Sequence, residues 1–231
     1  MSRSAAGPVC VFDAYGTLFD VHSAVMRHAD RLGPVAKPLS AHWREKQLEY
    51  TWTRALMERY IDFWQITVDA LEHAMASHGI DDATLRRELL DAYRRLDAYG
   101  EVAKTLAVLR ERGTPIVVFS NATSEMLATA LDASGINGLV DSVFSVDVLR
   151  TYKPAAAVYA AMTAQLGIDA SQVRFHSSNA WDAAGASAFG WQSCWINRCG
   201  APAEYTELPV REHRNLWDAI DPLLASVDDA H

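Results

Sequence analysis

This chain of 231 residues has little of several features, and each shortage narrows the class of protein. Its three cysteines, Cys10, Cys194 and Cys199, lack the spacing of a metal site and are typical of reduced thiols in a cytoplasmic protein. No apolar run approaches the roughly 18 residues of a membrane-spanning helix, and the amino terminus lacks the apolar core of a secretory signal. The net charge is -8, without a basic run or stripe. We therefore expect a cytoplasmic protein with neither a membrane nor a nucleic-acid partner.

Apolar sequence is abundant: 50% of the residues are hydrophobic, enough for one substantial core and a smaller inserted domain. Continuous apolar runs, without alternation, are typical of parallel strands buried on both faces. Five such runs are present, at 9–13, 115–119, 143–146, 172–176 and 193–197. Helical patterns lie between or after them, at 101–112, 123–134, 154–166, 182–189 and 213–226, the last expected to pack on the sheet. This alternation predicts an α/β fold with a doubly wound parallel sheet.

Residues 22–98 differ from the rest, because they hold almost no strand signal and are rich in helix formers and aromatic side chains. We expect them to form a helical cap between the first and second strands. Residues 33–38 include two prolines and a glycine and should break the helices, with Ser40 as the N-cap of the next helix. The expected domains are a core of residues 1–21 and 99–231 and a cap of residues 22–98.

Four polar clusters lie at the ends of the predicted strands, and one of them opens the helix that follows. They occupy residues 13–17, 120–121, 152–154 and 177–182. In a parallel sheet the carboxyl ends of the strands share one rim, so these clusters should meet there. A carboxylate at Asp13, hydroxyl groups, the ammonium group of Lys153 and a second carboxylate at Asp182 are the parts that covalent catalysis requires.

The order Asp-x-x-Gly-Thr, Ser-Asn, Lys-Pro and a final Asp resembles the four motifs of the haloacid dehalogenase superfamily across nearly the whole chain. Within it, four segments are similar to the type II L-2-haloacid dehalogenases: Asp-Ala-Tyr-Gly-Thr-Leu-Phe-Asp at 13–20, Trp-Arg-Glu-Lys-Gln-Leu-Glu-Tyr-Thr-Trp at 43–52, Tyr-Lys-Pro at 152–154 and Ser-Ser-Asn-Ala-Trp-Asp at 177–182. The resemblance implies a Rossmann-like core with a helical cap. It also implies a cofactor-free hydrolase that converts short-chain L-2-haloalkanoic acids and water to D-2-hydroxyalkanoic acids and halide, with inversion at C2, and it favours a homodimer.

The resemblance also implies residue roles. Asp13 would be the nucleophile that forms an ester, and Lys153 and Asp182 would orient and deprotonate the water that opens it. Arg44, on a cap helix, would receive the halide, because a guanidinium is always charged and weakly hydrated. A surface arginine on an amphipathic helix is the alternative reading of Arg44.

The other implied positions fall into two sets. Further catalytic or positioning residues are Thr17, Ser120, Tyr159, Ser177 and Asn179. Substrate-binding residues are Tyr15, Leu48, Phe63, Asn121 and Trp181. Asn121 would contact the halide or carboxylate, and the other four would form an apolar wall. Phe63 and Tyr159 could equally be plain core residues, since aromatic side chains at helical spacing usually are.

Two positions differ from the phosphatases of the superfamily, and three others differ from the pattern of the dehalogenases. Tyr15 and Ser178 stand where phosphatases of the superfamily carry acids for Mg²⁺, so we expect neither a metal nor another cofactor. A phosphatase or phosphonate hydrolase on the same fold, and a non-catalytic binding protein, are the alternatives. Glu45, Ala122 and His176 depart from the pattern and leave the preferred halide and chain length open.

Overall fold

The computed structural model describes residues 8–220 and contains a six-stranded sheet in the order β3-β2-β1-β4-β5-β6. The strands are β1 (Val9–Phe12), β2 (Ile116–Ser120), β3 (Ser142–Ser145), β4 (Val173–Ser177), β5 (Gln192–Ile196) and β6 (Val210–His213). Every neighbouring pair is parallel. Because the chain leaves β1 toward β2 and β3 and later returns to β4 on its other side, the order reverses beside β1, which is where open α/β sheets bind ligands. The predicted α/β fold and all five predicted strands are confirmed.

The sixth strand was missed. β6 is short and mostly exposed at the edge of the sheet, so it lacks the apolar run that marked the others. It takes up the start of the predicted helix 213–226. Within the described part of that range, residues 216–220 are helical, and residues 221–226 lie outside the described residues.

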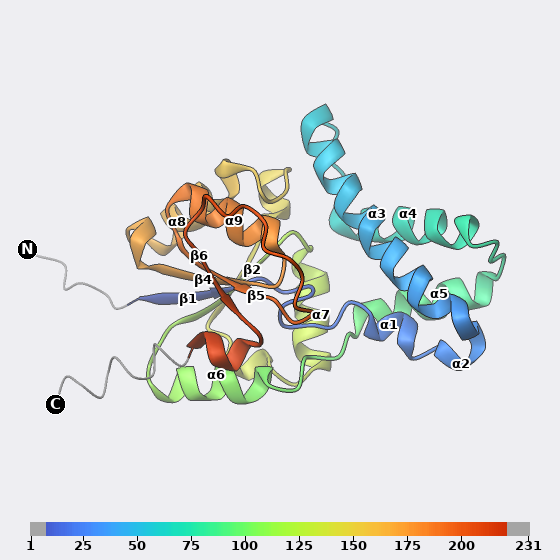
Figure 1. Ribbon diagram of the computed structural model, residues 1–231, viewed down its shortest axis with the longest axis horizontal. Helices are drawn as coiled ribbons and strands as arrows, with labels where there is room; N and C mark the ends of the chain where they lie inside the picture. The colour runs from blue at the N-terminus through green and yellow to red at the C-terminus, as the bar shows by residue number, and fades with distance from the viewer. Residues whose placement is uncertain (1–7, 221–231) are drawn as a thin grey trace, which may run out of the picture.

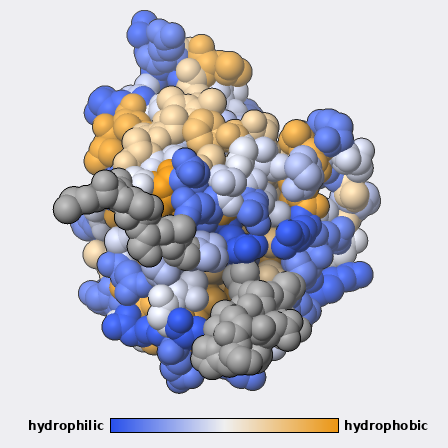
Figure 2. All heavy atoms as spheres, turned by 90° about the vertical axis from the view of Figure 1, so that its left-hand side faces the viewer, coloured by the Kyte–Doolittle hydropathy of each residue, from blue (hydrophilic) through white to orange (hydrophobic). Residues whose placement is uncertain are grey.

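Helices cover both faces of the sheet (Figure 1). One face packs on α6 (Val102–Glu111) and α7 (Ser124–Ala133), and the other on α8 (Ala156–Leu166) and α9 (Ala180–Phe189). Alternate β1 residues divide between the two apolar clusters, since Cys10 and Phe12 join one and Val9 and Val11 the other. Figure 2 shows the side of the molecule opposite the cap. Mildly apolar residues gather in its upper part, where α8 lies, and hydrophilic residues predominate in its lower part.

The cap, as residues 22–98 are called here following the proposed division, stands beside the sheet rather than on one of its faces (Figure 1). Its helices are α1 (Ser23–Met26), α2 (Ala29–Leu32), α3 (Ala36–Met57), α4 (Phe63–Ser77) and α5 (Ala83–Arg94). Asp62 caps α4 by accepting from the Gln65 amide, and Asp82 caps α5 in the same way. None of the helices in residues 8–220 is long and apolar enough to cross a bilayer.

The prediction that Ser40 caps a helix was wrong. Residues 33–35 form a short 3-10 helix, and α3 begins directly after it at Ala36. Pro38 is tolerated because it lies in the first turn of α3, where a backbone amide has no partner within the helix. Ser40 therefore lies inside α3, where its buried hydroxyl is 2.8 Å from the His22 Nδ1 atom.

Candidate active site

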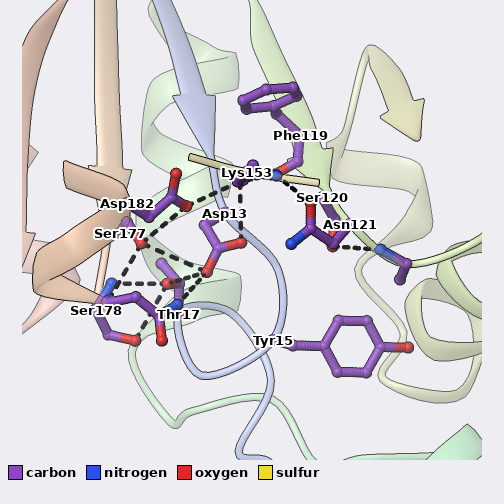
Figure 3. Close-up of polar contacts among 12 residues, drawn as sticks. Asp13, Tyr15, Thr17, Phe119, Ser120, Asn121, Lys153, Ser177, Ser178 and Asp182 are labelled. Atoms are coloured by element: carbon purple, nitrogen blue, oxygen red, sulfur yellow. Dashed lines mark hydrogen bonds and ion pairs between the residues drawn. The ribbon is translucent and has the colours of Figure 1, made fainter. Parts of the chain in front are cut away.

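Asp13 directly follows β1, and its nearly buried carboxylate is held by four side chains (Figure 3). Oδ2 accepts hydrogen bonds from Thr17 Oγ1 at 2.9 Å, Asn179 Nδ2 at 2.9 Å and Ser177 Oγ at 3.5 Å. Oδ1 lies 3.2 Å from the Lys153 ammonium. Among the described residues, one oxygen thus has three donors and the other has one. Oδ1 therefore keeps more of its lone pairs for chemistry.

The turn after Asp13 depends on Gly16. Its φ of +95° lies in the region that favours glycine, and a Cβ there would lie 3.1 Å from the Ser178 hydroxyl. The turn brings Thr17 back beside Asp13, and Thr17 Oγ1 also accepts from the Ser178 amide at 2.8 Å. The loops after β1 and β4 are thereby joined.

Lys153 lies between the two acids and is almost completely buried. Its ammonium donates to the Phe119 carbonyl at 2.6 Å, Asp182 Oδ2 at 2.9 Å and Asp13 Oδ1 at 3.2 Å, which uses all three of its protons (Figure 3). Its backbone amide donates to Asn121 Oδ1 at 2.9 Å. A buried cation with two carboxylate partners lowers the cost of keeping both acids away from water.

Asp182, in the first turn of α9, is fully buried behind Lys153. Its Oδ1 accepts from the Tyr159 hydroxyl at 2.8 Å, and its Oδ2 from Lys153 and from Ser177 Oγ at 3.3 Å. Burial raises the pKa of Asp182 to about 6, although Lys153 opposes this and Asp13 adds to it. Burial and then the Asp182 charge raise the pKa of Tyr159 well above its usual value, so this hydroxyl stays protonated and donates.

Arg44 reaches the site from α3 in the cap and is half-buried. Its Nη2 donates to the Tyr15 carbonyl at 3.1 Å and to Asn179 Oδ1 at 3.3 Å. The Asn179 amide therefore contacts both Asp13 and Arg44. Glu45, the next residue on α3, is exposed, so its charge faces solvent rather than the site.

The predicted substrate-binding residues enclose a small cavity of about 20 Å³. Its lining comes from both cap and core: Asp13, Tyr15, Arg44, Leu48, Phe63, Ser120, Asn121, Lys153, Asn179 and Trp181. Tyr15 is fixed there by stacking on Tyr93, with ring centroids 5.6 Å apart, and by its contact with Phe63. Ten of the fourteen predicted site residues thus line the cavity. The other four, Thr17, Tyr159, Ser177 and Asp182, lie behind Asp13 and Lys153.

Two contributors were not found from the sequence. The Phe119 carbonyl is a backbone group, and backbone acceptors carry no residue-type signal. Gly185 lies one helical turn after Asp182, and a Cβ there would lie 2.7 Å from the Tyr159 hydroxyl. The missing side chain lets Tyr159 approach Asp182, and the only signal was a glycine inside a helical pattern. His176 stacks on Phe12, and burial lowers its pKa to about 4, so it is a neutral core side chain.

The donor set does not suit Mg²⁺, which prefers several oxygen ligands around a compact centre. Lys153 already occupies the space between Asp13 and Asp182, and positions 15 and 178 supply a tyrosine and a serine instead of acids. Within residues 8–220 no group of three histidine, cysteine or acidic side chains could hold a metal ion.

A comparison with known proteins agrees with this geometry. The family model of haloacid dehalogenase-like hydrolases matches residues 8–190. (S)-2-haloacid dehalogenase 4A of Burkholderia cepacia is 46% identical over 217 residues, which cover 94% of each chain. A solved dehalogenase structure in an intermediate complex is 44% identical, covers 96% of this chain and 98% of that chain, and has a TM-score of 0.91. L-2-haloacid dehalogenase from Xanthobacter autotrophicus, solved with chloropropionic acid covalently bound, is 31% identical with a TM-score of 0.85, covering 98% and 100%.

A buried aspartate at the carboxyl end of a parallel strand, with a lysine and a second acid beside it, is an arrangement that a hydrolase can use. The chain belongs to the haloacid dehalogenase-like hydrolases and, within them, to the group of the (S)-2-haloacid dehalogenases.

Proposed function

We propose that this enzyme hydrolyses short-chain L-2-haloalkanoic acids to D-2-hydroxyalkanoic acids through an ester on Asp13, without a metal or other cofactor. The observation that carries the proposal is the unequal pairing of the Asp13 oxygens. Thr17, Asn179 and Ser177 all donate to Oδ2, so they hold the carboxylate and leave Oδ1 as the attacking atom. The kinship with haloacid dehalogenases supplies the substrate class.

In the first step Oδ1 attacks C2 from the side opposite the carbon–halogen bond. The C2–O bond forms, the carbon–halogen bond breaks, and the halide leaves with the electron pair. Arg44 lines the cavity beside Asn179 and supplies the positive charge for the departing halide. Ser120 and Asn121 also line it and bind the substrate carboxylate. Asn121 uses its Nδ2 group, since its Oδ1 is occupied by the Lys153 amide.

In the second step water opens the ester at the Asp13 carbonyl carbon. A carboxylate has about four lone-pair positions. Tyr159, Lys153 and Ser177 fill three on Asp182, and the fourth accepts a proton from the water. The water oxygen stays on Asp13, the bond between Cγ and Oδ1 breaks, and Oδ1 leaves as the product hydroxyl with the proton from Asp182. The second proton of the water leaves to solvent as Asp13 returns to a carboxylate. Only the first step touches C2, so the configuration inverts once.

A single turnover in H₂¹⁸O with enzyme in excess tests the ester. The label should appear in the peptide that carries Asp13, and the product should stay unlabelled and be the D-hydroxy acid. Direct attack of water on C2 predicts labelled product and an unlabelled peptide, and either result would overturn the nucleophilic role of Asp13. The product from L-2-chloropropionate is analysed on a chiral column in the same sample, where L-lactate would exclude a single displacement.

We also propose that the enzyme works as a homodimer in the cytoplasm. The dimer is supported by large apolar side chains on the surface, among them Met26, 39% exposed, and Val148, 71% exposed. The compartment is supported by three unpaired cysteines, of which Cys199 is exposed. Light scattering coupled to size-exclusion chromatography measures the oligomeric state, and a monomer at micromolar concentration would contradict the proposed dimer. Cell fractionation tests the proposed cytoplasmic location.

A further inference from the structure

A second cavity lies beside the active site and has a different chemical character. This side cavity has a volume of about 420 Å³. Its lining comes from the end of α3, from the loop before α8, from α9 and from the loop before β6: Trp52, Ala55, Leu56, Tyr152, Lys153, Pro154, Ala155, Trp181 and Tyr205. Nothing in the proposed reaction of a short haloacid uses it.

The side cavity and the active-site cavity meet at Lys153 and Trp181, which line both. The cap connects them too. Residues spaced by four lie on one face of a helix, and along α3 Arg44 and Leu48 line the active-site cavity while Trp52 and Leu56 line the side cavity. The rings of Trp52 and Trp181 meet edge to face, with centroids 5.5 Å apart, at the boundary between cap and core.

The lining of the side cavity suits hydrocarbon. Among the described residues around it, Lys153 is the one charged side chain, and its ammonium is bound on the other side by Asp13, Asp182 and the Phe119 carbonyl. The cavity thus offers aromatic and aliphatic surface and no free cation for a carboxylate. A fatty-acid-like ligand would place its tail here and its carboxylate in the polar site.

The active-site cavity is too small for any haloacid unless its lining side chains move apart, and Trp181 is one of these. Its volume of about 20 Å³ holds little more than one water, since a water needs on the order of 10–15 Å³ by this measure. The halide and carboxylate of a substrate already take up the polar side. A longer alkyl group on C2 must therefore leave this cavity, and the neighbouring apolar space beyond Trp181 is available to it.

We infer, resting on the function proposed above, that the side cavity binds the alkyl tail of medium-chain L-2-haloalkanoates and that Trp52 and Trp181 form the passage to it. Burial of each further methylene in such a space raises kcat/KM by about fourfold, until the tail reaches solvent. The substrate class of this enzyme then extends beyond haloacetate and halopropionate to acids of five to eight carbons.

The test uses the full-length protein and L-2-chloroalkanoates of three to eight carbons, with the ratio of kcat/KM for the longest to the shortest substrate as the readout. The wild type should give a ratio above one. Trp52→Glu places a charge in the side cavity, and Leu56→Glu places one at its rim, where Leu56 is 87% exposed; both should lower that ratio by at least tenfold. Met57→Glu is the matched control, because Met57 is also an exposed apolar residue at the end of α3 but does not line the cavity. It should leave the ratio unchanged.

A steep fall of kcat/KM from three to five carbons in the wild type would overturn the inference, as would the same ratio in all four proteins. If Leu56→Glu instead dissociates a dimer and leaves the ratio intact, a second copy of the chain covers the cavity. Chloropropionate turnover separately reports the proposed function. If chloropropionate is not turned over, calorimetry with octanoate and propionate still tests the side cavity. Octanoate should then bind more tightly than propionate, and Leu56→Glu, but not Met57→Glu, should remove this difference in affinity.

Discussion

Replacing Asp182 with asparagine should divide the reaction into its two steps. Asparagine keeps the shape of the side chain and an oxygen that can accept from Tyr159, but it loses the negative charge and cannot take a proton from water. Asp182 makes no direct contact with the proposed attacking oxygen of Asp13, whose described partner is Lys153. Loss of a general base typically costs about 10²–10⁴ in rate, and this loss should fall on hydrolysis of the ester.

Formation of the ester should slow much less. In Asp182→Asn, Lys153 keeps the Phe119 carbonyl and Asp13 as acceptors, so its ammonium should stay in place and donate somewhat more strongly to Asp13. With the second step slowed by two orders of magnitude or more, nearly all enzyme should carry the ester during turnover. Rapid mixing with L-2-chloropropionate should then release a burst of one chloride per active site, followed by a slow phase.

Intact-protein mass spectrometry after acid quench should show one added substrate group, and peptide mapping should place it on Asp13. Asp91→Asn, an exposed acid on α5, is the matched control and should turn over like the wild type without a burst. Circular dichroism establishes that both variants are folded. The reasoning is refuted if Asp182→Asn turns over slowly without an adduct, because the acid would then act in the first step. It is also refuted if turnover is normal.

Three further outcomes follow from the same geometry. Arg44→Ala should slow ester formation by about 10²–10³-fold. Arg44→Lys should restore little of this rate, because an ammonium is a compact, strongly hydrated charge. A near-normal single-turnover rate in Arg44→Ala would show that Arg44 has no part in the reaction. Dialysis against EDTA should leave halide release unchanged, whereas a loss of activity that Mg²⁺ restores would favour a phosphatase. Burial raises the pKa of Asp182 to about 6, and its base form is needed, so ester hydrolysis should fall about tenfold per pH unit below that value and level off above it; a flat profile down to pH 5 would contradict this.

The sequence was most informative where a physical rule links position to place. Continuous apolar runs predicted the buried strands, and the shared rim of a parallel sheet predicted that Asp13, Lys153 and Asp182 would meet although 169 positions separate the first from the last in the chain. The cap residues were harder, because Arg44 and Phe63 have the periodicity of any amphipathic helix. Only the motif resemblance distinguished them, and the structure places both at the cavity.

What could not be predicted depends on backbone atoms, small residues and exposed edges. The Phe119 carbonyl holds Lys153, and any residue at that position would offer the same acceptor. Gly185 matters through an absent side chain. β6 has the exposed residues of an edge strand, so local pattern could not separate it from a loop. α3 begins at Ala36 although Pro38 follows, because a proline is tolerated in the first turn of a helix. A proline alone therefore could not fix where the helix begins.

In the proposed mechanism the two steps use charged groups from different parts of the molecule. In the proposed first step negative charge moves from Asp13 in the core to a halide beside Arg44, so this step uses a side chain of the cap that contacts the core. In the second step the proton moves between water, Asp182 and the ester oxygen, and Lys153, Ser177 and Asp182 all belong to the core. Since Tyr15 and Ser178 add no negative charge at the rim, an anionic substrate can enter without a metal ion to offset repulsion.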